Sequence, residues 1–418
     1  MRRPLAVLLF ILLATAAGAQ ESVSNDLTNK AFKAIEAKDF KSAATLLEQA
    51  VKANPKNATA HGNLGYVLAV LKRTPEALAH SEKAIELDPK PAYTYVNAAV
   101  YAHALSDFTK LKKYGTSALA FPKGAVKPDD AKLVKTLLEE MKPRVYTVTW
   151  ALDPKDAWGD GGQGKGPFYT AMPSTGLPFQ TSTFELRGAK SHEVMTRDGV
   201  DVLKFDANGP VELTATVTVR FVDYRPRLNA KPPGSIPVDA KAYLGAGARL
   251  DPASAKVKAV AATVKGDSPR QTIDNLLVWL KGNMTYEHPT TFKTVDEVLD
   301  RGNGDCGAYS ALFVAACRAN GIPAREVWGV TKASTRFAPA GHLASHVWAE
   351  VYLDGLGWVP VEPQNANGLG HMPTGYVRLM HYVTDKHAWP GALKNANAAE
   401  WFGKPATIPT YTEKLGAE

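Results

Sequence analysis

Apolar and polar positions follow two different periods along this chain of 418 residues. From Leu27 to about Phe121 the apolar residues recur at helical spacing, and small residues repeat at an interval of 34 positions. The matching positions are Pro55 and Pro89, Ala43 and Ala77, and Ala50, Ala84 and Ala118. Such a pattern is typical of stacked helical hairpins, in which two helices approach closely and a proline ends the second. It predicts about three repeats with a capping helix over Asp129 to Met141.

The period changes to two between Arg144 and about Pro226. In residues 211–221, Val, Leu, Ala and Phe alternate with Glu, Thr and Arg, so that one face of a strand is apolar and the other polar. Further strands are predicted over Val145 to Trp150, Thr183 to Leu186 and Val200 to Phe205. Asp-Gly and Asn-Gly pairs at 198–199 and 208–209 indicate turns between them. The pattern predicts a β-rich, sandwich-like domain.

Helical spacing returns after a proline-rich linker. Cys306 begins an apolar helix that also contains Cys317. The positive end of a helix dipole favours the thiolate, which is the nucleophilic form of cysteine, so Cys306 is a candidate nucleophile. Cys317 lies about three turns further on, with the two α-carbons about 16 Å apart, which is too far for a disulfide. We therefore interpret Cys317 as a core residue.

A histidine and a carboxylate follow on a predicted β-hairpin. His346 begins a run of alternating polar and apolar residues, the turn at 354–357 reverses the chain, and Glu362 lies on the return strand. A cysteine nucleophile needs a base that takes its proton and a group that orients that base. Because paired strands bring these side chains together, we expect Glu362 to lie within reach of the His346 ring.

Two stretches of this region resemble the core of the transglutaminase-like superfamily, a branch of the papain-like fold: GNGDCGAYSALFVAACRANGIPARE and HVWAEVYLDGLGWVPVEP. The resemblance is close over Asp296 to Pro363 and looser over the preceding helices and the β-rich segment. It implies that Cys306 is the nucleophile, that His346 is general base and then acid, and that Glu362 holds the imidazole.

The third residue departs from that family, which usually has Asp there. Glu362 has one more methylene, so its oxygen must be drawn back by about 1.5 Å, and a misplaced imidazole costs up to ~10⁴ in rate in the analogous serine triad. If Glu362 does not reach the ring, Asn365 is the alternative, since an Asn has this role in papain-like enzymes.

The helical repeats resemble tetratricopeptide repeats. Five residues of the middle unit match that motif: Leu64, Gly65, Ala77, Ala84 and Pro89. The outer units are more degenerate, with Ala31 in place of the usual glycine and Leu111 in place of a small residue. The resemblance implies that a protein or extended peptide binds in the concave groove. The alternative is that the repeats only brace the rest of the chain.

The first residues have the features of a secretory leader. Arg2 and Arg3 precede an apolar run from Leu5 to Ala17, and small residues at 17–19 resemble a cleavage site. The run is shorter than the ~20 residues that a membrane-spanning helix needs, and no second long apolar stretch follows. We expect a signal peptide over residues 1–19, a periplasmic or secreted mature chain, and no transmembrane span after leader removal. An uncleaved anchor is the alternative.

Composition and charge exclude several classes of protein. Lys and Arg total 49 against 41 Asp and Glu, giving a mild net charge of +8 without the long like-charged runs that mark nucleic-acid arms. Two cysteines cannot form a disulfide framework or a four-cysteine zinc site. His342 and His346, four apart on a strand, lie about 13 Å apart, so no metal site is expected. The loop containing Gly164 and Lys165 resembles a phosphate loop, but Gly166 replaces the required Ser or Thr, and no cofactor is expected.

The sequence therefore predicts a multidomain α and α+β protein. Its parts are a signal peptide (1–19), a tetratricopeptide-repeat helical domain (24–142), a β-rich domain (143–232) and a transglutaminase-like core (240–418). The predicted function is that of a bacterial cysteine amidase, peptidase or transglutaminase-type acyltransferase, which forms a thioester on Cys306. Its expected substrates are proteins or peptides, among them peptidoglycan peptides. The alternative is a non-catalytic envelope scaffold with a silent core domain.

Overall fold

The computed structural model describes most of the chain. The described residues are 4–105, 107–154, 158–159, 162–163, 166–175, 177–197, 200–224, 228, 236–247, 249–287, 291–332, 341–365, 368–372, 374–381 and 410–415. The predicted turn at 198–199, Gly164 and Lys165 of the phosphate-loop-like segment, and most of the proline-rich linker lie outside them. The chain forms two compact units, Met1–Glu140 and Met141–Glu418, and each is considered by itself.

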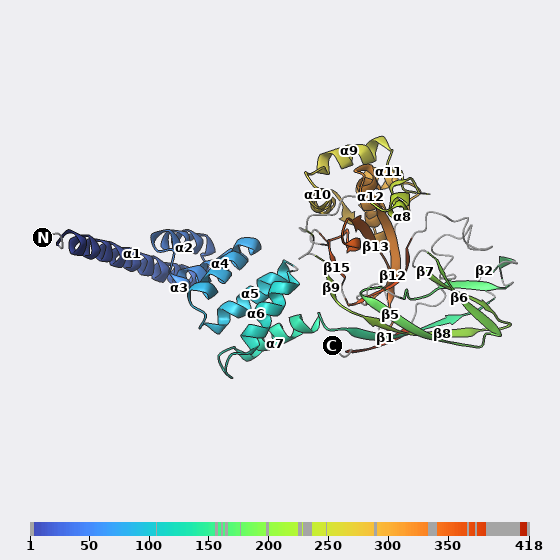
Figure 1. The fold of residues 1–418 in the computed structure, drawn as a ribbon, viewed down its shortest axis with the longest axis horizontal. Coiled ribbons are helices and arrows are strands. Elements are labelled where there is room, and N and C mark those ends of the chain that lie inside the picture. The colour runs from blue at the N-terminus through green and yellow to red at the C-terminus, as the bar shows by residue number, and fades with distance from the viewer. Residues whose placement is uncertain are drawn as a thin grey trace. The chain divides into compact units, whose positions relative to one another are not determined.

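The first unit consists of helices throughout (Figure 1). Its helices are α1 (Pro4–Glu36), α2 (Phe40–Ala53), α3 (Ala58–Val70), α4 (Thr74–Leu87), α5 (Ala92–Ala104), α6 (Phe108–Leu119) and α7 (Pro128–Glu139). Successive helices pack as the hairpins α1–α2, α3–α4 and α5–α6, and α7 contacts both α5 and α6. The predicted array of three repeats with a capping helix is confirmed.

Small residues at the repeat interval allow the helices of each hairpin to approach closely. The repeated alanines are buried: Ala43, Ala50, Ala77, Ala84 and Ala118. A Cβ on Gly65 in α3 would lie 2.7 Å from the Ser81 hydroxyl and 2.9 Å from the Ala77 carbonyl oxygen in α4. Contacts below about 3 Å are not tolerated, so only glycine fits where these two helices meet.

The second unit contains two antiparallel sheets that form its β-rich part (Figure 1). One has the order β17-β1-β8-β5, with β1 (Arg144–Leu152), β5 (Gln180–Arg187), β8 (Val211–Val219) and β17 (Thr410–Leu415). The other has the order β3-β2-β4-β7-β6, with β2 (Trp158–Gly159), β3 (Gly162–Gln163), β4 (Phe168–Ala171), β6 (Ser191–Arg197) and β7 (Val200–Asp206). Apolar residues of β1, β8, β4 and β7 meet in one hydrophobic cluster, which makes this part sandwich-like.

The remainder of the second unit is a helical layer on a four-stranded antiparallel sheet of order β14-β13-β12-β16. The strands are β12 (Ala324–Thr331), β13 (Ala344–Leu353), β14 (Gly357–Val361) and β16 (Tyr376–His381). The helices are α8 (Val238–Lys241), α9 (Ala255–Val264), α10 (Pro269–Asn283), α11 (Val295–Arg301) and α12 (Cys306–Ala319), and α8 continues into a 3-10 turn at Ala242–Leu244. Short strands also pair β9 (Val222–Asp223) with β15 (His371–Met372) and β10 (Thr285–Tyr286) with β11 (Asn303–Gly304).

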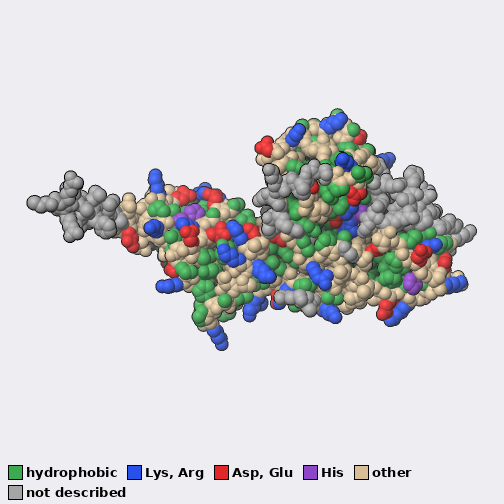
Figure 2. Space-filling model, in the orientation of Figure 1, with side chains coloured by type: hydrophobic (Ala, Val, Ile, Leu, Met, Phe, Trp, Pro, Cys, Tyr) green, Lys and Arg blue, Asp and Glu red, His purple; other side chains and the backbone are tan. Residues whose placement is uncertain are grey.

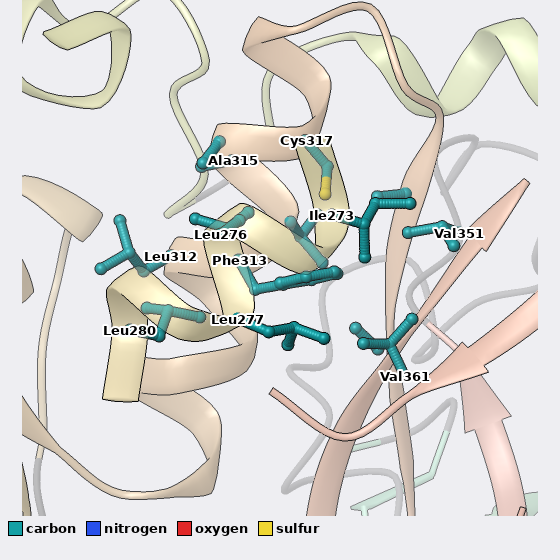
Figure 3. Close-up of a cluster of buried hydrophobic side chains, with 14 of the residues drawn as sticks. Ile273, Leu276, Leu277, Leu280, Leu312, Phe313, Ala315, Cys317, Val351 and Val361 are labelled. Atoms are coloured by element: carbon teal, nitrogen blue, oxygen red, sulfur yellow. The ribbon is translucent and has the colours of Figure 1, made fainter. Parts of the chain in front are cut away.

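Helix α12 is the centre of this α+β core. It contacts β12 and β13 on one side and α9, α10 and α11 on the others. Figure 3 shows Phe313 of α12 between Leu277 of α10 and the strand residues Val351 and Val361. Each of these side chains is almost completely buried, and burying a Leu, Val or Phe side chain contributes about 1.5–3 kcal/mol. Because α12 packs against strands and helices on several sides, the position of its first residue, Cys306, is also set.

The β-rich part and the α+β core share apolar contacts. Val330, Val377 and Leu379 of the core sheet belong to the same hydrophobic cluster as Val148 and Val217 of the β-rich part. The predicted division between residues 232 and 240 therefore lies inside one compact unit. Among the residues that the structure describes, no helix has both the length and the apolar character needed to cross a membrane.

Candidate active site

Cys306 is the first residue of α12, as its sequence context predicts. Gly302, with a left-handed φ of 65°, ends α11, and the Asp305 side chain accepts a hydrogen bond from the backbone N–H of Ala308, which caps α12. The thiol therefore lies at the positive end of a helix, and its residue is partly exposed. Cys317, in contrast, is a completely buried free thiol in the core, and burial raises its pKa.

A buried hydrogen bond joins the start of α12 to the start of β13. The Ser310 hydroxyl donates to the carbonyl oxygen of Val347 at 3.1 Å. Ser310 lies one turn after Cys306 and therefore on the same helix face, while Val347 directly follows His346. The side chains of Cys306 and His346 share a hydrogen bond in this arrangement.

His346 connects the thiol to the carboxylate of Glu362. Its Nε2 lies 2.8 Å from Glu362 Oε2. An ionised carboxylate only accepts hydrogen bonds, so Nε2 carries the hydrogen and Nδ1 is left for the thiol of Cys306. This is the tautomer that a general base needs in order to take a proton from the thiol.

The pKa of His346 reflects two opposing effects. Burial disfavours the charged ring and alone would lower this pKa. The hydrogen bonds to Cys306 and Glu362, together with the negative charges of these two groups, outweigh burial and raise the pKa of His346 to about 10. The raised pKa means that the ring holds a proton readily, as a base that takes the thiol proton must.

The backbone directly after β14 brings Glu362 to the ring. The Glu362 N–H donates to the carbonyl oxygen of Gly368 at 3.0 Å, and the Asn365 N–H donates to the carbonyl oxygen of Glu362 at 3.0 Å. A Cβ on Gly368 would lie 2.1 Å from that same Glu362 oxygen, so this tight loop requires glycine. Glu362 therefore reaches His346 despite its extra methylene, and the ring hydrogen bond that the sequence left open between Glu362 and Asn365 is made by Glu362.

Sequence reasoning missed Tyr376. The Tyr376 hydroxyl donates to Glu362 Oε2 at 3.0 Å, and its ring packs edge-on against His346 with centroids 5.1 Å apart. The ring of Trp348, two residues after His346 on β13, stacks on the imidazole with ring centroids 6.0 Å apart. No pattern in the sequence indicated Tyr376.

Gly329 provides the space for these rings. It pairs with His346 in the β12–β13 ladder and lies at an irregularity in the β12–β16 register. A Cβ there would lie 2.2 Å from the Val377 carbonyl oxygen and 2.6 Å from the Trp348 ring.

Gly329→Ala is expected to destabilise the second unit by about 1–3 kcal/mol, because the backbone or the Trp348 ring must move to accommodate a methyl group. The measurement is urea unfolding followed by tryptophan fluorescence. Gly282→Ala is the control, since Gly282 lies in α10 with nothing within 4 Å, and this change should stabilise by about 0.5–1 kcal/mol. Equal effects of the two changes would contradict the expected crowding at Gly329.

The described residues contain no group of three or more His, Cys, Asp or Glu side chains that could hold a metal ion. His342 precedes β13 and bridges to Thr410, whereas His346 is engaged by Cys306 and Glu362. The side chains gathered here are a thiol, a base and a carboxylate that orients the base.

Fold and site together describe an α+β domain with a cysteine at a helix N-terminus, preceded by helical repeats. Residues 258–363 match the model of the transglutaminase-like superfamily, and residues 33–91 match a tetratricopeptide-repeat model. The chain thus carries a transglutaminase-like domain and tetratricopeptide repeats, as its motifs predicted.

Two curated proteins match parts of the chain. An uncharacterised protein of Haemophilus influenzae is 36% identical over an alignment of 86 residues, and the match covers 16% of this chain and 23% of that protein. The STIP1 homologue of Dictyostelium discoideum is 27% identical over 134 residues, which are 32% of this chain and 22% of that protein. The chain therefore spans less than a quarter of the length of these relatives.

Solved structures resemble both parts of the chain. A candidate cysteine protease from Cytophaga hutchinsonii is 16% identical, with a TM-score of 0.42, over 66% of this chain and 88% of that one. The Arabidopsis OM64 tetratricopeptide domain is 22% identical, with a TM-score of 0.27, over 28% of this chain and 96% of that one.

Proposed function

We propose that the protein is a cysteine enzyme that acts on amide bonds through a thioester on Cys306. The observation that carries the proposal is the series of hydrogen bonds from Cys306 through His346 to Glu362. These contacts set the tautomer of the His346 ring and raise its pKa. The transglutaminase-like family match over residues 258–363 supports it.

The first half-reaction forms the thioester. His346 Nδ1 takes the thiol proton, and the Cys306 sulfur attacks the carbonyl carbon of the substrate amide. The C–N bond then breaks, and the leaving amine takes the proton from His346. Glu362 keeps the imidazole in position and stabilises its positive charge during this step. The backbone N–H of Cys306, at the start of α12, is the proposed donor to the oxyanion.

The second half-reaction releases the acyl group. A water molecule or an amine attacks the thioester carbonyl while His346 takes its proton, and that proton returns to the departing sulfur of Cys306. Water yields a carboxylic acid, as in an amidase or peptidase, whereas an amine yields a new amide, as in a crosslinking enzyme. The proposed substrates are protein or peptide amides, including peptidoglycan peptides, at a periplasmic or secreted location.

The tetratricopeptide repeats resemble domains that bind peptides and proteins, and we propose that they recruit such a partner. Phe32 of α1 and Tyr66 of α3 hold equivalent positions 34 residues apart and are 52% and 42% exposed. Large apolar side chains that recur on the surface of successive repeats favour a partner over bare solvent. Acidic and basic side chains are interspersed on the face of this unit in Figure 2, which agrees with a mild net charge.

Mass spectrometry of the full chain tests the proposed chemistry. Incubation with Gln- or Asn-containing peptides, or with peptidoglycan stem peptides, followed by acid quenching, should reveal an acyl adduct on the peptide that contains Cys306. Cys306→Ala should abolish the adduct and turnover, whereas Cys317→Ala should retain both, because Cys317 is sealed in the core. Adding methylamine then distinguishes hydrolysis from transfer by the product formed. The absence of any adduct, with turnover unaffected by Cys306→Ala, would support the scaffold alternative.

A further inference from the structure

We infer that Tyr376 is a positioning residue that allows a glutamate to serve where a shorter carboxylate would otherwise be needed. The inference rests on the proposed function, because it concerns how the His346 ring is held for reaction with Cys306. Tyr376 does not contact the substrate in this proposal. It acts through Glu362.

One oxygen of the Glu362 carboxylate receives both short hydrogen bonds. Oε2 lies 2.8 Å from His346 Nε2 and 3.0 Å from the Tyr376 hydroxyl, whereas the contact of Oε1 with the Gln364 N–H is longer, at 3.4 Å. The loop after β14 fixes the backbone of Glu362 but leaves its side-chain torsions free. Glutamate has one more such torsion than aspartate. The Tyr376 hydroxyl restrains the carboxylate at the oxygen that the imidazole uses.

Tyr376 is itself held firmly enough to act as a fixed donor. Its ring packs edge-on against both His346, at 5.1 Å, and Trp348, at 5.4 Å. Its backbone pairs with Thr331 of β12, and the neighbouring Gly375 carbonyl oxygen accepts a hydrogen bond from Lys332 N–H at 3.2 Å. The hydroxyl thus has a defined position on the sheet face that carries His346.

The path of the Tyr376 side chain depends on the order of the strands. Tyr376 begins β16, and Glu362 follows β14, at the opposite side of the sheet, so β12 and β13 lie between them. The β12 residue paired with His346 is Gly329, which places no side chain in the way. The two side chains can therefore meet above the sheet at the imidazole.

The Tyr376 hydroxyl is in its neutral, protonated form, which is the form that donates a hydrogen bond. Burial and the neighbouring negative charge of Glu362 both raise the pKa of Tyr376 well above its ordinary value. The phenol therefore remains protonated over the whole pH range in which an amide-cleaving site would work, and it cannot compete with His346 as a base.

The test separates the hydroxyl from the ring. Tyr376→Phe retains the packing on His346 and Trp348 but removes the hydrogen bond to Glu362. The readout is the rate of Cys306 alkylation by iodoacetamide in the full chain between about pH 6 and pH 8, together with thermal unfolding. Tyr376→Phe should react about tenfold more slowly than wild type at the acid end of this range, the expected effect of losing a hydrogen bond to a charged group. Tyr352→Phe, on β13 but packed on Trp358, is the matched control and should retain the wild-type profile.

A double-mutant comparison shows whether Tyr376 acts through Glu362. If it does, Tyr376→Phe should have no further effect in a Glu362→Gln background. A Tyr376→Phe rate equal to that of wild type, or an undiminished effect in the Glu362→Gln background, would overturn the inference while the proposed function stands. A wild-type rate that rises about tenfold per pH unit, as for an ordinary thiol, would overturn both.

Discussion

Replacing His346 with alanine is expected to slow the alkylation of Cys306 relative to wild type, most strongly at the acid end of the range between about pH 6 and pH 8. The raised pKa of His346, about 10, means that the imidazolium persists through this range and stabilises a thiolate beside it. Without the ring, the thiol must lose its proton to solvent. Turnover of any amide substrate should fall by at least ~10³, as when a member of the analogous serine triad is removed.

The measurement is the time course of carbamidomethylation of the peptide that contains Cys306, by mass spectrometry. Cys317 does not interfere, because it is completely buried. His192→Ala, in the exposed strand β6, is the matched control and should react like wild type. A profile for His346→Ala that matches wild type would show that the ring does not activate the thiol.

Replacing Glu350 with glutamine is expected to destabilise the second unit by about 3–5 kcal/mol. Glu350 lies on β13, buried between two guanidinium groups: Arg325 bonds Oε2 at 2.8 Å and Arg378 bonds Oε1 at 3.1 Å. Both arginines are buried as well, and His381 lies against each of them. Removing this negative charge deprives two buried guanidinium groups of the carboxylate that lies between them.

The melting temperature of Glu350→Gln should fall by roughly 10 °C, since about 1 kcal/mol corresponds to a few degrees in a unit of this size. The matched control is Glu185→Gln, whose ion pair with Arg187 is exposed at both ends and should contribute little. A melting temperature for Glu350→Gln within a degree or two of the control would contradict the role given to the buried charges.

The same cluster makes stability depend on pH. Burial alone would raise the pKa of Glu350, but the charges of Arg378 and Arg325 outweigh it and lower the pKa below its ordinary value. A carboxyl group whose pKa is lower in the folded state stabilises the fold fully above about pH 4.5, and this contribution is lost as the pH falls through the folded-state pKa. The difference in stability between wild type and Glu350→Gln should therefore shrink in acid.

Local patterns were sufficient to predict the parts of this fold that depend on neighbours in sequence. The 34-residue interval located the hairpins because each helix packs on the next one. The proximity of His346 and Glu362 was predictable because a short turn joins β13 to β14, and the register pairs Ala349 with Val361. The capped helix start at Cys306 was readable from Asp305 and the glycines before it.

The contacts that the sequence did not predict join distant segments. Strand β16 is buried at nearly every position, so it shows no alternation, and it includes the charged Arg378, which sequence patterns place at a surface. Glu350, which bonds Arg378, likewise lies at a position that the sequence pattern assigns to the polar face of a strand. Tyr376 could not be assigned because its role depends on the order of four strands, which a single sequence does not specify. Strand β6 was missed because nearly all of its described side chains are exposed.

Strand β1 pairs on one side with β17, which is the last described strand of the chain, so this edge of the sheet forms late in synthesis. Thr410–Leu415 cover the edge of Arg144–Leu152, with Leu415 opposite Arg144, so the first strand of the unit acquires its outer neighbour from the last described strand. Until residue 415 is available, β1 presents a row of unpaired backbone groups, a surface on which other chains can add as strands. The helical repeats, whose contacts are local, can fold while this edge is still open. Pairing of this edge of β1 therefore comes after the rest of the described chain has been made.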